Sequence, residues 1–248
     1  MTDPTGAPGP ADPDGSEVAA VLREGEMTVH GRIAGSSNAT LLVTCTAGGT
    51  EVMAVYKPAR GERPLWDFPS GLHRREVAAY ELSEALGWGI VPRTVARPDG
   101  PFGPGSVQRF VPEDGESHYF TVREDPRWHP VLVTIAAFDV VANNADRKSG
   151  HVLFAEERLW AIDNGLSFHV EQKLRTVIWD FAGDPLPDDL LADLDRLVSG
   201  GLPDAVASLI DPDERVALRR RAEALLAESR LPEPDDDRDW PPYPWPLV

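Results

Sequence analysis

The hydrophobic and polar positions of this chain change their periodicity near its middle. Before about residue 112, short β-type runs alternate with turn sequences, and one longer stretch has helical periodicity. Beyond that point, apolar and amphipathic stretches of helical length dominate. The pattern therefore predicts an α+β fold with a sheet-rich first half and a mostly helical second half.

The first half contains five β-type runs and one helix. Turn sequences such as Ala34–Asn38 and Gly48-Gly49 separate the first three runs, which predicts antiparallel pairing. A helix is expected over 72–86, because apolar residues recur along one face and Gly87 follows as a stop signal. The five predicted strands are 27–33, 40–46, 51–56, 91–96 and 106–111.

The second half begins with a nearly continuous apolar run over 130–141, which predicts a buried helix. A polar segment over 143–149 follows, and then two short strands that form a hairpin. These strands are predicted over 151–155 and 159–162. Three further helices are expected near 188–198, 203–210 and 213–229.

The two ends of the chain differ in composition from the rest. Residues 1–17 are rich in Pro, Gly, Asp and Ala, which predicts a flexible extension. Residues 231–248 combine prolines with tryptophans that are costly to leave in water. We expect this tail to pack along the surface, with docking of a protein partner as the alternative. One lobe is expected over 18–112 and a second over 113–230.

Composition and charge narrow the classes of function. The 248 residues are 42% hydrophobic and 26% charged, which is typical of a globular chain. The formal net charge of −17 opposes binding to nucleic acid and to anionic membranes, so neither is expected as a stable partner. Cys45 is the single cysteine, which excludes an intrachain disulfide. A reducing cytoplasm is therefore the expected location.

Two acidic residues flank the predicted hairpin. Asp146 lies in the polar loop NNADRKSGH after the buried helix, and Asp163 lies in AIDNGLSF after the second strand. Because a hairpin joins them, both are expected at the same edge of a cleft. Each residue alone also fits an ordinary loop ion pair or turn, so the pair carries more information than either member.

Together with a preceding lysine and glutamate, these loops resemble the protein-kinase-like superfamily. The similarity is to phosphatidylinositol 3-/4-kinase-type domains, more narrowly to the small actinobacterial proteins of that type, and more distantly to HipA-type kinases. It covers about residues 27 to 230 and rests on VMAVYKP with Lys57, HRREVAAYELSEALG with Glu76, and the two loops. The resemblance implies a two-lobed kinase-like fold, with an antiparallel five-stranded sheet and one helix in the N-lobe and a mostly helical C-lobe.

The resemblance also implies ATP as the phosphate donor, with Mg²⁺ or Mn²⁺. Lys57 would project toward the α- and β-phosphates, and Glu76 would hold it there. Glu81 and Glu84 are the alternatives to Glu76.

Two backbone segments complete the implied nucleotide site. The loop between the first two strands would lie over the phosphates, and a plain hairpin turn is the alternative. The backbone near Arg109 and Val111 would pair with adenine. The loop residues expected to contact phosphate are Gly35, Ser36, Ser37 and Asn38.

The two loops around the hairpin would supply catalysis and metal binding. By resemblance, Asp146 orients or deprotonates the acceptor hydroxyl, Lys148 reaches the γ-phosphate, and Asp163 chelates the metal. The family pattern has a metal-binding asparagine where this chain has His151. An imidazole suits Mn²⁺ better than Mg²⁺. Three consequences are open: the protein uses a different metal, Asn144 or Asn164 supplies the missing oxygen ligand, or phosphate transfer is weak.

The leading hypothesis is a kinase that transfers phosphate to a hydroxyl of a protein or a small soluble molecule. The acidic charge disfavours a membrane lipid as the acceptor. One alternative is a nucleotide-binding pseudokinase that acts as a regulatory module, which the histidine at 151 suggests. The other is a transferase of AMP on the same fold.

Overall fold

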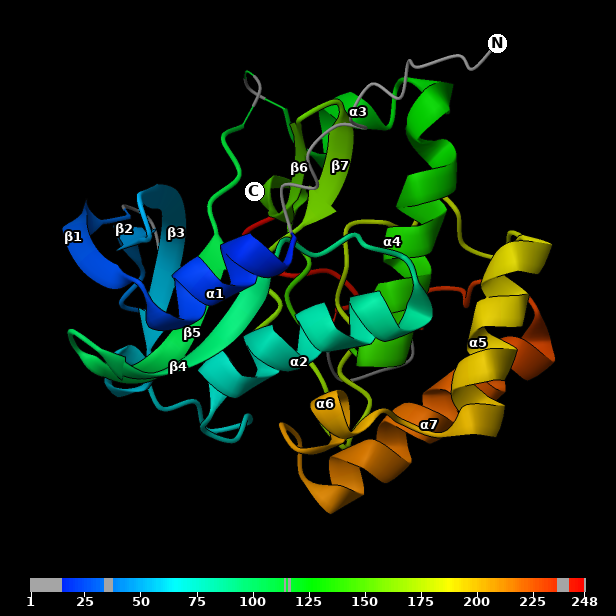
Figure 1. Cartoon of the computed structure of the whole chain (residues 1–248). Coiled ribbons are helices and arrows are strands. Elements are labelled where there is room, and N and C mark those ends of the chain that lie inside the picture. The colour runs from blue at the N-terminus through cyan, green and yellow to red at the C-terminus, as the bar shows by residue number, and fades with distance from the viewer. Residues whose placement is uncertain (1–14, 34–37, 114, 116, 236–240, 248) are drawn as a thin grey trace, which may run out of the picture.

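The computed structural model describes residues 15–33, 38–113, 115, 117–235 and 241–247. A five-stranded antiparallel sheet lies on one side of the molecule (Figure 1). Helices α4 (His129–Ala142), α5 (Asp188–Gly200) and α7 (Pro212–Glu228) lie on the other side, and α2 (Leu72–Leu86) and a two-stranded hairpin lie between them. This arrangement confirms the predicted α+β class with its antiparallel sheet.

The sheet has the strand order β1-β2-β3-β5-β4. The turn Gly48-Gly49 joins β2 to β3, and both glycines have the positive φ that such a turn requires. All five predicted strands are found, with ends displaced by a few residues. Their bounds are β1 Glu26–Arg32, β2 Leu41–Ala47, β3 Thr50–Pro58, β4 Thr94–Gly100 and β5 Gly103–Arg109.

Two helices pack against the sheet. The predicted helix is α2, Leu72–Leu86, and Gly87 ends it with φ 77°. A further helix, α1 over Ser16–Glu24, was not predicted from the sequence. It buries Val21 and Leu22 against the cluster of the sheet.

Polar contacts tie α2 to the helical side of the molecule as well. The Arg75 guanidinium donates to the carboxylate of Glu214, and both side chains are 4% exposed. At the other end of the helix, Arg196 donates to the Leu86 carbonyl at 2.9 Å. Helix α2 is therefore fixed to the helices that follow the hairpin.

The remaining elements follow the predicted order. The apolar run forms α4, His129–Ala142, and the predicted hairpin forms β6, Val152–Ala155, with β7, Arg158–Ala161. A 3₁₀ turn over Ser149–His151 leads into β6. The other helices are α3 Tyr119–Val122, α5 Asp188–Gly200, α6 Asp204–Ala207 and α7 Pro212–Glu228.

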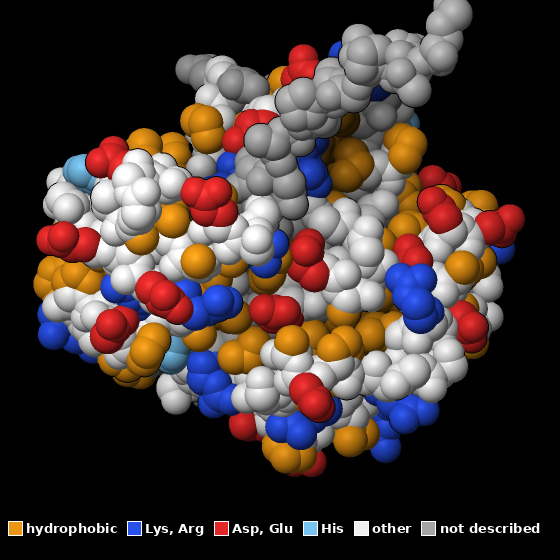
Figure 2. Space-filling model, viewed as in Figure 1, with side chains coloured by type: hydrophobic (Ala, Val, Ile, Leu, Met, Phe, Trp, Pro, Cys, Tyr) orange, Lys and Arg blue, Asp and Glu red, His pale blue; other side chains and the backbone are white. Residues whose placement is uncertain are grey.

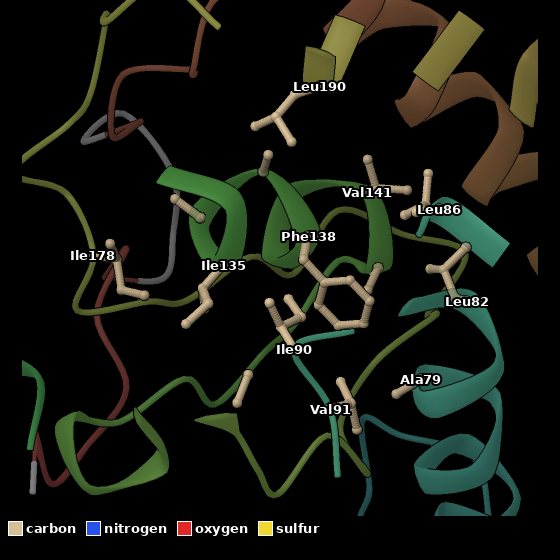
Figure 3. Close-up of a cluster of buried hydrophobic side chains, with 14 of the residues drawn as sticks. Ala79, Leu82, Leu86, Ile90, Val91, Ile135, Phe138, Val141, Ile178 and Leu190 are labelled. Carbon is tan, nitrogen blue, oxygen red and sulfur yellow. The ribbon is translucent and has the colours of Figure 1, made fainter. Parts of the chain in front are cut away.

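The main hydrophobic core joins α2 to the helical side. Phe138 of α4 is fully buried, and its ring points toward Ile90 and Val91 on the chain that leaves α2 (Figure 3). Leu82 and Leu86 of α2 pack in the same cluster. This core holds α2 and α4 in fixed relation, which positions the residues that each helix carries into the cleft.

Acidic and basic side chains are interspersed over the face shown in Figure 2, with hydrophobic side chains between them. Among the residues that the structure describes, no helix combines the length and the apolar character needed to cross a bilayer.

Candidate active site

A cleft of about 580 Å³ lies between the sheet and the hairpin. Cavities of roughly 300–1,000 Å³ are typical of small-molecule sites. Val55 and Lys57 of β3 line one wall, and Asp146 and Asp163 line the other. Lys148 and His151 line this cleft as well, so the two loops around the hairpin and the strand lysine face one space.

Lys57 bridges two carboxylates inside this cleft. Its ammonium donates to Glu76 and, at 2.8 Å, to Asp163 Oδ1. Burial alone lowers the pKa of Lys57, but the charges of Asp163 and Glu76 outweigh it, so the pKa lies above its usual range. Lys57 is therefore a fixed positive charge at the centre of the site.

Glu76, rather than Glu81 or Glu84, is the partner of Lys57. Its second oxygen accepts from the Asn164 amide at 3.1 Å, which links α2 to the loop after β7. A Cβ on Gly165 would lie 3.1 Å from Glu76 Oε1. The glycine therefore provides room for this carboxylate. It does not supply the turn itself, because the residue with positive φ is Asp163, at 55°.

Asp163 carries its two oxygens in different directions. Oδ1 accepts from Lys57, and Oδ2 lies 3.4 Å from His151 Nε2. The charge of Lys57 holds the pKa of Asp163 below its usual range, although burial opposes this. Asp163 is therefore a carboxylate with one oxygen available to a cation.

Asp146 lies in the same cleft as Asp163. Burial raises its pKa to about 6, while the charge of Lys148 opposes the shift. Lys148 Nζ lies 3.3 Å from Asp146 Oδ2. A group with this pKa can accept a proton near neutral pH, as a general base must.

His151 is oriented by the loop that carries Asp146. Its Nδ1 lies 2.9 Å from the Asp146 carbonyl, which only accepts, and 3.4 Å from the Lys148 amide, which only donates, and the shorter contact favours a proton on Nδ1. Burial lowers the pKa of His151 to about 4, although Asp163 opposes the shift, so the ring is neutral at neutral pH. The Nε2 lone pair therefore points toward the carboxylate of Asp163.

This donor pair fits a divalent cation. Two lone-pair donors that face one another are stable when a cation lies between them, and metal-bound imidazoles usually donate their other N–H to a carbonyl or carboxylate. Ligands about 2.1 Å from one ion, at about 90° to 110°, lie about 3.0–3.4 Å apart, which matches the observed 3.4 Å. Within the described ranges, no three His, Cys, Asp or Glu side chains gather as a metal site.

The two asparagines considered as oxygen donors are engaged elsewhere. Asn144 Oδ1 accepts from the Asp146 amide at 2.9 Å, and Asn164 Oδ1 accepts from Arg147 at 2.6 Å. Both residues are fully buried. Neither presents its oxygen to the space between His151 and Asp163.

A buried ion pair behind the site was missed by the sequence analysis. Arg147 donates through Nε and Nη2 to the Asp139 carboxylate of α4 at 2.9–3.1 Å, and both side chains are fully buried. Its Nη1 donates to the Ile162 carbonyl at 2.7 Å. Arg147 therefore joins α4, the loop of Asp146 and the loop of Asp163. The one signal in the sequence was a single acid inside the apolar run of α4.

The predicted adenine segment lies at the end of β5. The Arg109 amide donates to the Arg93 carbonyl at 2.8 Å, and the Phe110 amide donates to Met53 at 2.9 Å. The Arg109 side chain forms an ion pair with Glu156 at 2.7 Å. Val111 also lines the cleft. The Arg109 amide is thus engaged by the backbone of residue 93. Of the two predicted residues, Val111 is therefore the better placed to bind adenine through its backbone.

The predicted phosphate loop is only partly described. Gly35, Ser36 and Ser37 lie outside the described residues, and Asn38 lines a recess at the Lys57 end of the cleft.

The described part of the C-terminal tail packs against the site from behind. The Leu247 carbonyl accepts from the Ser149 amide at 2.8 Å, next to the loop of Asp146. The Pro242 carbonyl accepts from the Thr176 amide and from Trp179 Nε1, both at 3.1 Å. The Trp245 side chain is 87% exposed.

The chain is similar to one curated protein, Protein Rv2133c of Mycobacterium tuberculosis. The two are 41% identical over 269 residues, which cover 92% of this chain and 94% of the relative. No family model matches the chain.

Several solved structures share the fold at low sequence identity. Hydra Fam20 with sugar has a TM-score of 0.57 and 14% identity, and covers 86% of this chain and 87% of its own. The Golgi casein kinase with Mn/ADP bound has a TM-score of 0.54 and 15% identity. The match covers 86% of this chain and 74% of the kinase. The Helicobacter pylori proinflammatory kinase CtkA has a TM-score of 0.52 and 10% identity. The match covers 85% of this chain and 94% of CtkA. These similarities confirm the protein-kinase-like fold.

Proposed function

Because the chain belongs to the same family as Protein Rv2133c of Mycobacterium tuberculosis and has a protein-kinase-like fold, we propose that it is a metal-assisted, ATP-dependent phosphotransferase. Its acceptor is a hydroxyl of a protein or of a small soluble molecule. The resemblance to phosphatidylinositol 3-/4-kinase-type domains is part of this proposal.

One observation carries the proposal. Lys57, Asp146 and Asp163 come from distant parts of the sequence and meet in one cleft of a size suited to a nucleotide. Phosphoryl transfer needs little covalent chemistry from the protein and depends on positioning and charge. A fixed ammonium, a metal-binding carboxylate and a proton-accepting carboxylate supply these requirements.

Each group then has a defined task. Lys57, held by Glu76, binds the phosphates of ATP, and Val111 offers its backbone to the base. Asp146 accepts the proton of the acceptor hydroxyl as the oxygen attacks the γ-phosphorus and the bond to the ADP oxygen breaks. Lys148, which lies beside Asp146, is placed to balance charge on the transferred group.

Asp163 Oδ2 and His151 Nε2 are the groups that would hold the divalent metal. Such an ion neutralises charge on the β- and γ-phosphates. Magnesium and manganese sites in nucleotide-dependent enzymes commonly use one or two protein ligands, with phosphate oxygens and water as the others. The solved Golgi casein kinase that contains Mn/ADP supports a nucleotide with a divalent metal on this fold.

The position of the transferred label tests the proposal. The protein is incubated with ATP labelled at either the γ- or the α-phosphate, with Mg²⁺ or Mn²⁺, and with itself and water as the first acceptors. We expect the γ-label to appear on protein or as free phosphate, while the α-label stays in ADP. Transfer of the α-label would indicate an AMP transferase, and binding without turnover would indicate a pseudokinase.

The pKa of Asp146 predicts the pH dependence of turnover. The carboxylate must be ionised to accept a proton, so kcat/KM should rise with pH through about 6 and then level off. Phosphate release from ATP, with water as acceptor, is measured from about pH 5 to about pH 8. Asp146→Asn should lose turnover at every pH and keep nucleotide binding. A flat profile in the unchanged protein would exclude Asp146 as the base.

The imidazole ligand predicts a preference for manganese. Nitrogen ligands suit Mn²⁺ better than the oxygen-demanding Mg²⁺. His151→Asn should shift the Mn²⁺/Mg²⁺ affinity ratio toward Mg²⁺ by about tenfold. Electron paramagnetic resonance of Mn²⁺ with bound ADP, with Mg²⁺ as competitor, measures this ratio without turnover. An unchanged ratio in the variant would remove His151 from the metal site.

A further inference from the structure

The cleft continues past Lys57 and Asp163 into a smaller recess of about 70 Å³. Thr40, Lys57, Asp146 and Asp163 line both spaces, so the recess is a continuation of the cleft. It lies beyond Lys57, whereas Val111 lines only the main cleft. A nucleotide with its base near Val111 would direct its phosphate chain toward this recess.

A histidine and a glutamate form a pair at the recess. His73 is the second residue of α2, and its Nδ1 lies 2.6 Å from Glu62 Oε1. Glu62 also accepts from the backbone amides of Gly71 and His73 at 2.9 and 2.8 Å. Burial alone raises the pKa of Glu62, but the hydrogen bonds from His73 and Gly71 outweigh it and lower the pKa to about 2. The carboxylate is therefore ionised and fixes the direction of the imidazole ring.

The other ring nitrogen of His73 is available. Among the described residues, no partner is found for Nε2, and the side chain is 17% exposed. Lys57 is the other basic side chain described in the wall of the recess, and two carboxylates already engage it. Within the described part of this wall, His73 Nε2 is therefore a basic atom that is not engaged by another protein group.

Capping of α2 does not account for the imidazole. Glu62 caps the first turn through the two backbone amides, and these bonds need no side chain at position 73. The remaining wall carries the carboxylates of Glu62, Glu76, Asp146 and Asp163. A second donor beside Lys57 in the wall of this recess would stabilise an anionic group that enters with its metal ion.

We propose that His73 is an imidazolium when ATP is bound, with Nδ1–H donated to Glu62 as its positioning residue and Nε2–H donated to the terminal phosphate. The inference rests on the proposed function and adds a contact that the resemblance does not supply. ADP lacks the group that reaches the recess. His73 therefore makes the site discriminate between triphosphate and diphosphate.

Titration calorimetry with two nucleotides tests this assignment. The unchanged protein and His73→Ala are titrated with ADP and with the non-hydrolysable β,γ-imido analogue of ATP, both with Mn²⁺. We expect the variant to bind the triphosphate about tenfold more weakly and ADP within about twofold. His73→Gln, which keeps an N–H donor, should recover part of the loss. Glu62→Gln should give a smaller loss, again confined to the triphosphate.

His30→Ala is the matched control, because His30 is exposed on β1 and, within the described part of the chain, bonds to Thr44. It should bind both nucleotides normally. A His73→Ala variant with unchanged affinities, or with equal losses for the two nucleotides, would overturn the assignment. Thermal unfolding midpoints show whether an equal loss comes from unfolding. If the unchanged protein binds neither nucleotide, the proposed function itself fails.

Discussion

Asp163→Asn is expected to reduce phosphate transfer by about a thousandfold and to weaken metal-dependent nucleotide binding. The substitution removes the charge that faces His151 Nε2 at 3.4 Å and that also pairs with Lys57 at 2.8 Å. Lys57 retains Glu76 as a partner, so the fold of the cleft should persist. Release of labelled phosphate measures transfer, and calorimetry with ADP in the presence and absence of Mn²⁺ measures binding.

Asp146→Asn is the matched control for this variant. It removes the carboxylate of the same cleft that is assigned as the base, so transfer should be lost while Mn²⁺-dependent binding of ADP remains. The contrast between the two variants separates the metal ligand from the base. Unchanged activity in both variants would contradict the site, and equal loss of binding in both would contradict the division of tasks.

Asp139→Ala is expected to lower the free energy of unfolding by about 3–5 kcal/mol. The change leaves the Arg147 guanidinium fully buried without a carboxylate, and an uncompensated buried charge is strongly destabilising. Denaturant unfolding measures the loss. Because Arg147 also holds the loops of Asp146 and Asp163, turnover should fall in the same variant at temperatures where it is still folded.

Two comparisons isolate the effect of the buried charge. Glu223→Gln breaks the exposed helical pair with Arg219 and should change stability by less than about 0.5 kcal/mol. Replacing both buried partners, as Asp139→Leu with Arg147→Met, should recover much of the stability lost in Asp139→Ala. A small effect of Asp139→Ala by itself would show that the buried pair contributes little.

The sequence predicted the elements whose periodicity is strong. The apolar run over 130–141 and the amphipathic stretch over 72–86 became α4 and α2 nearly residue for residue. Helix α1 was missed because it adjoins a segment of Pro, Gly and Asp, whose composition obscured a short apolar face. Strand β4 was placed three residues too early, because Val91-Pro92 reads as a β-type run although proline cannot donate to the ladder.

The residues of the candidate site were predictable where their position along the sequence, relative to the predicted strands and helices, indicates a role. Asp146 and Asp163 were found from their places in the loops around the predicted hairpin, and Lys57 and Glu76 from the resemblance to kinases. The structure brings the four side chains to one recess of the cleft. The partners of Arg147 and His73 were not predicted. Each bond joins residues whose pairing depends on the three-dimensional packing of separate segments, and neither spacing nor composition specifies such pairs.

The attachment of α2 has a mechanical consequence for the cleft. Arg75 with Glu214, and Arg196 with the Leu86 carbonyl, fasten α2 to the helical side, whereas Lys57 belongs to the sheet. Any displacement of β3 relative to α2 would therefore stretch the contact between Lys57 and Glu76. The position of the lysine charge thus depends on how the sheet is seated against α2.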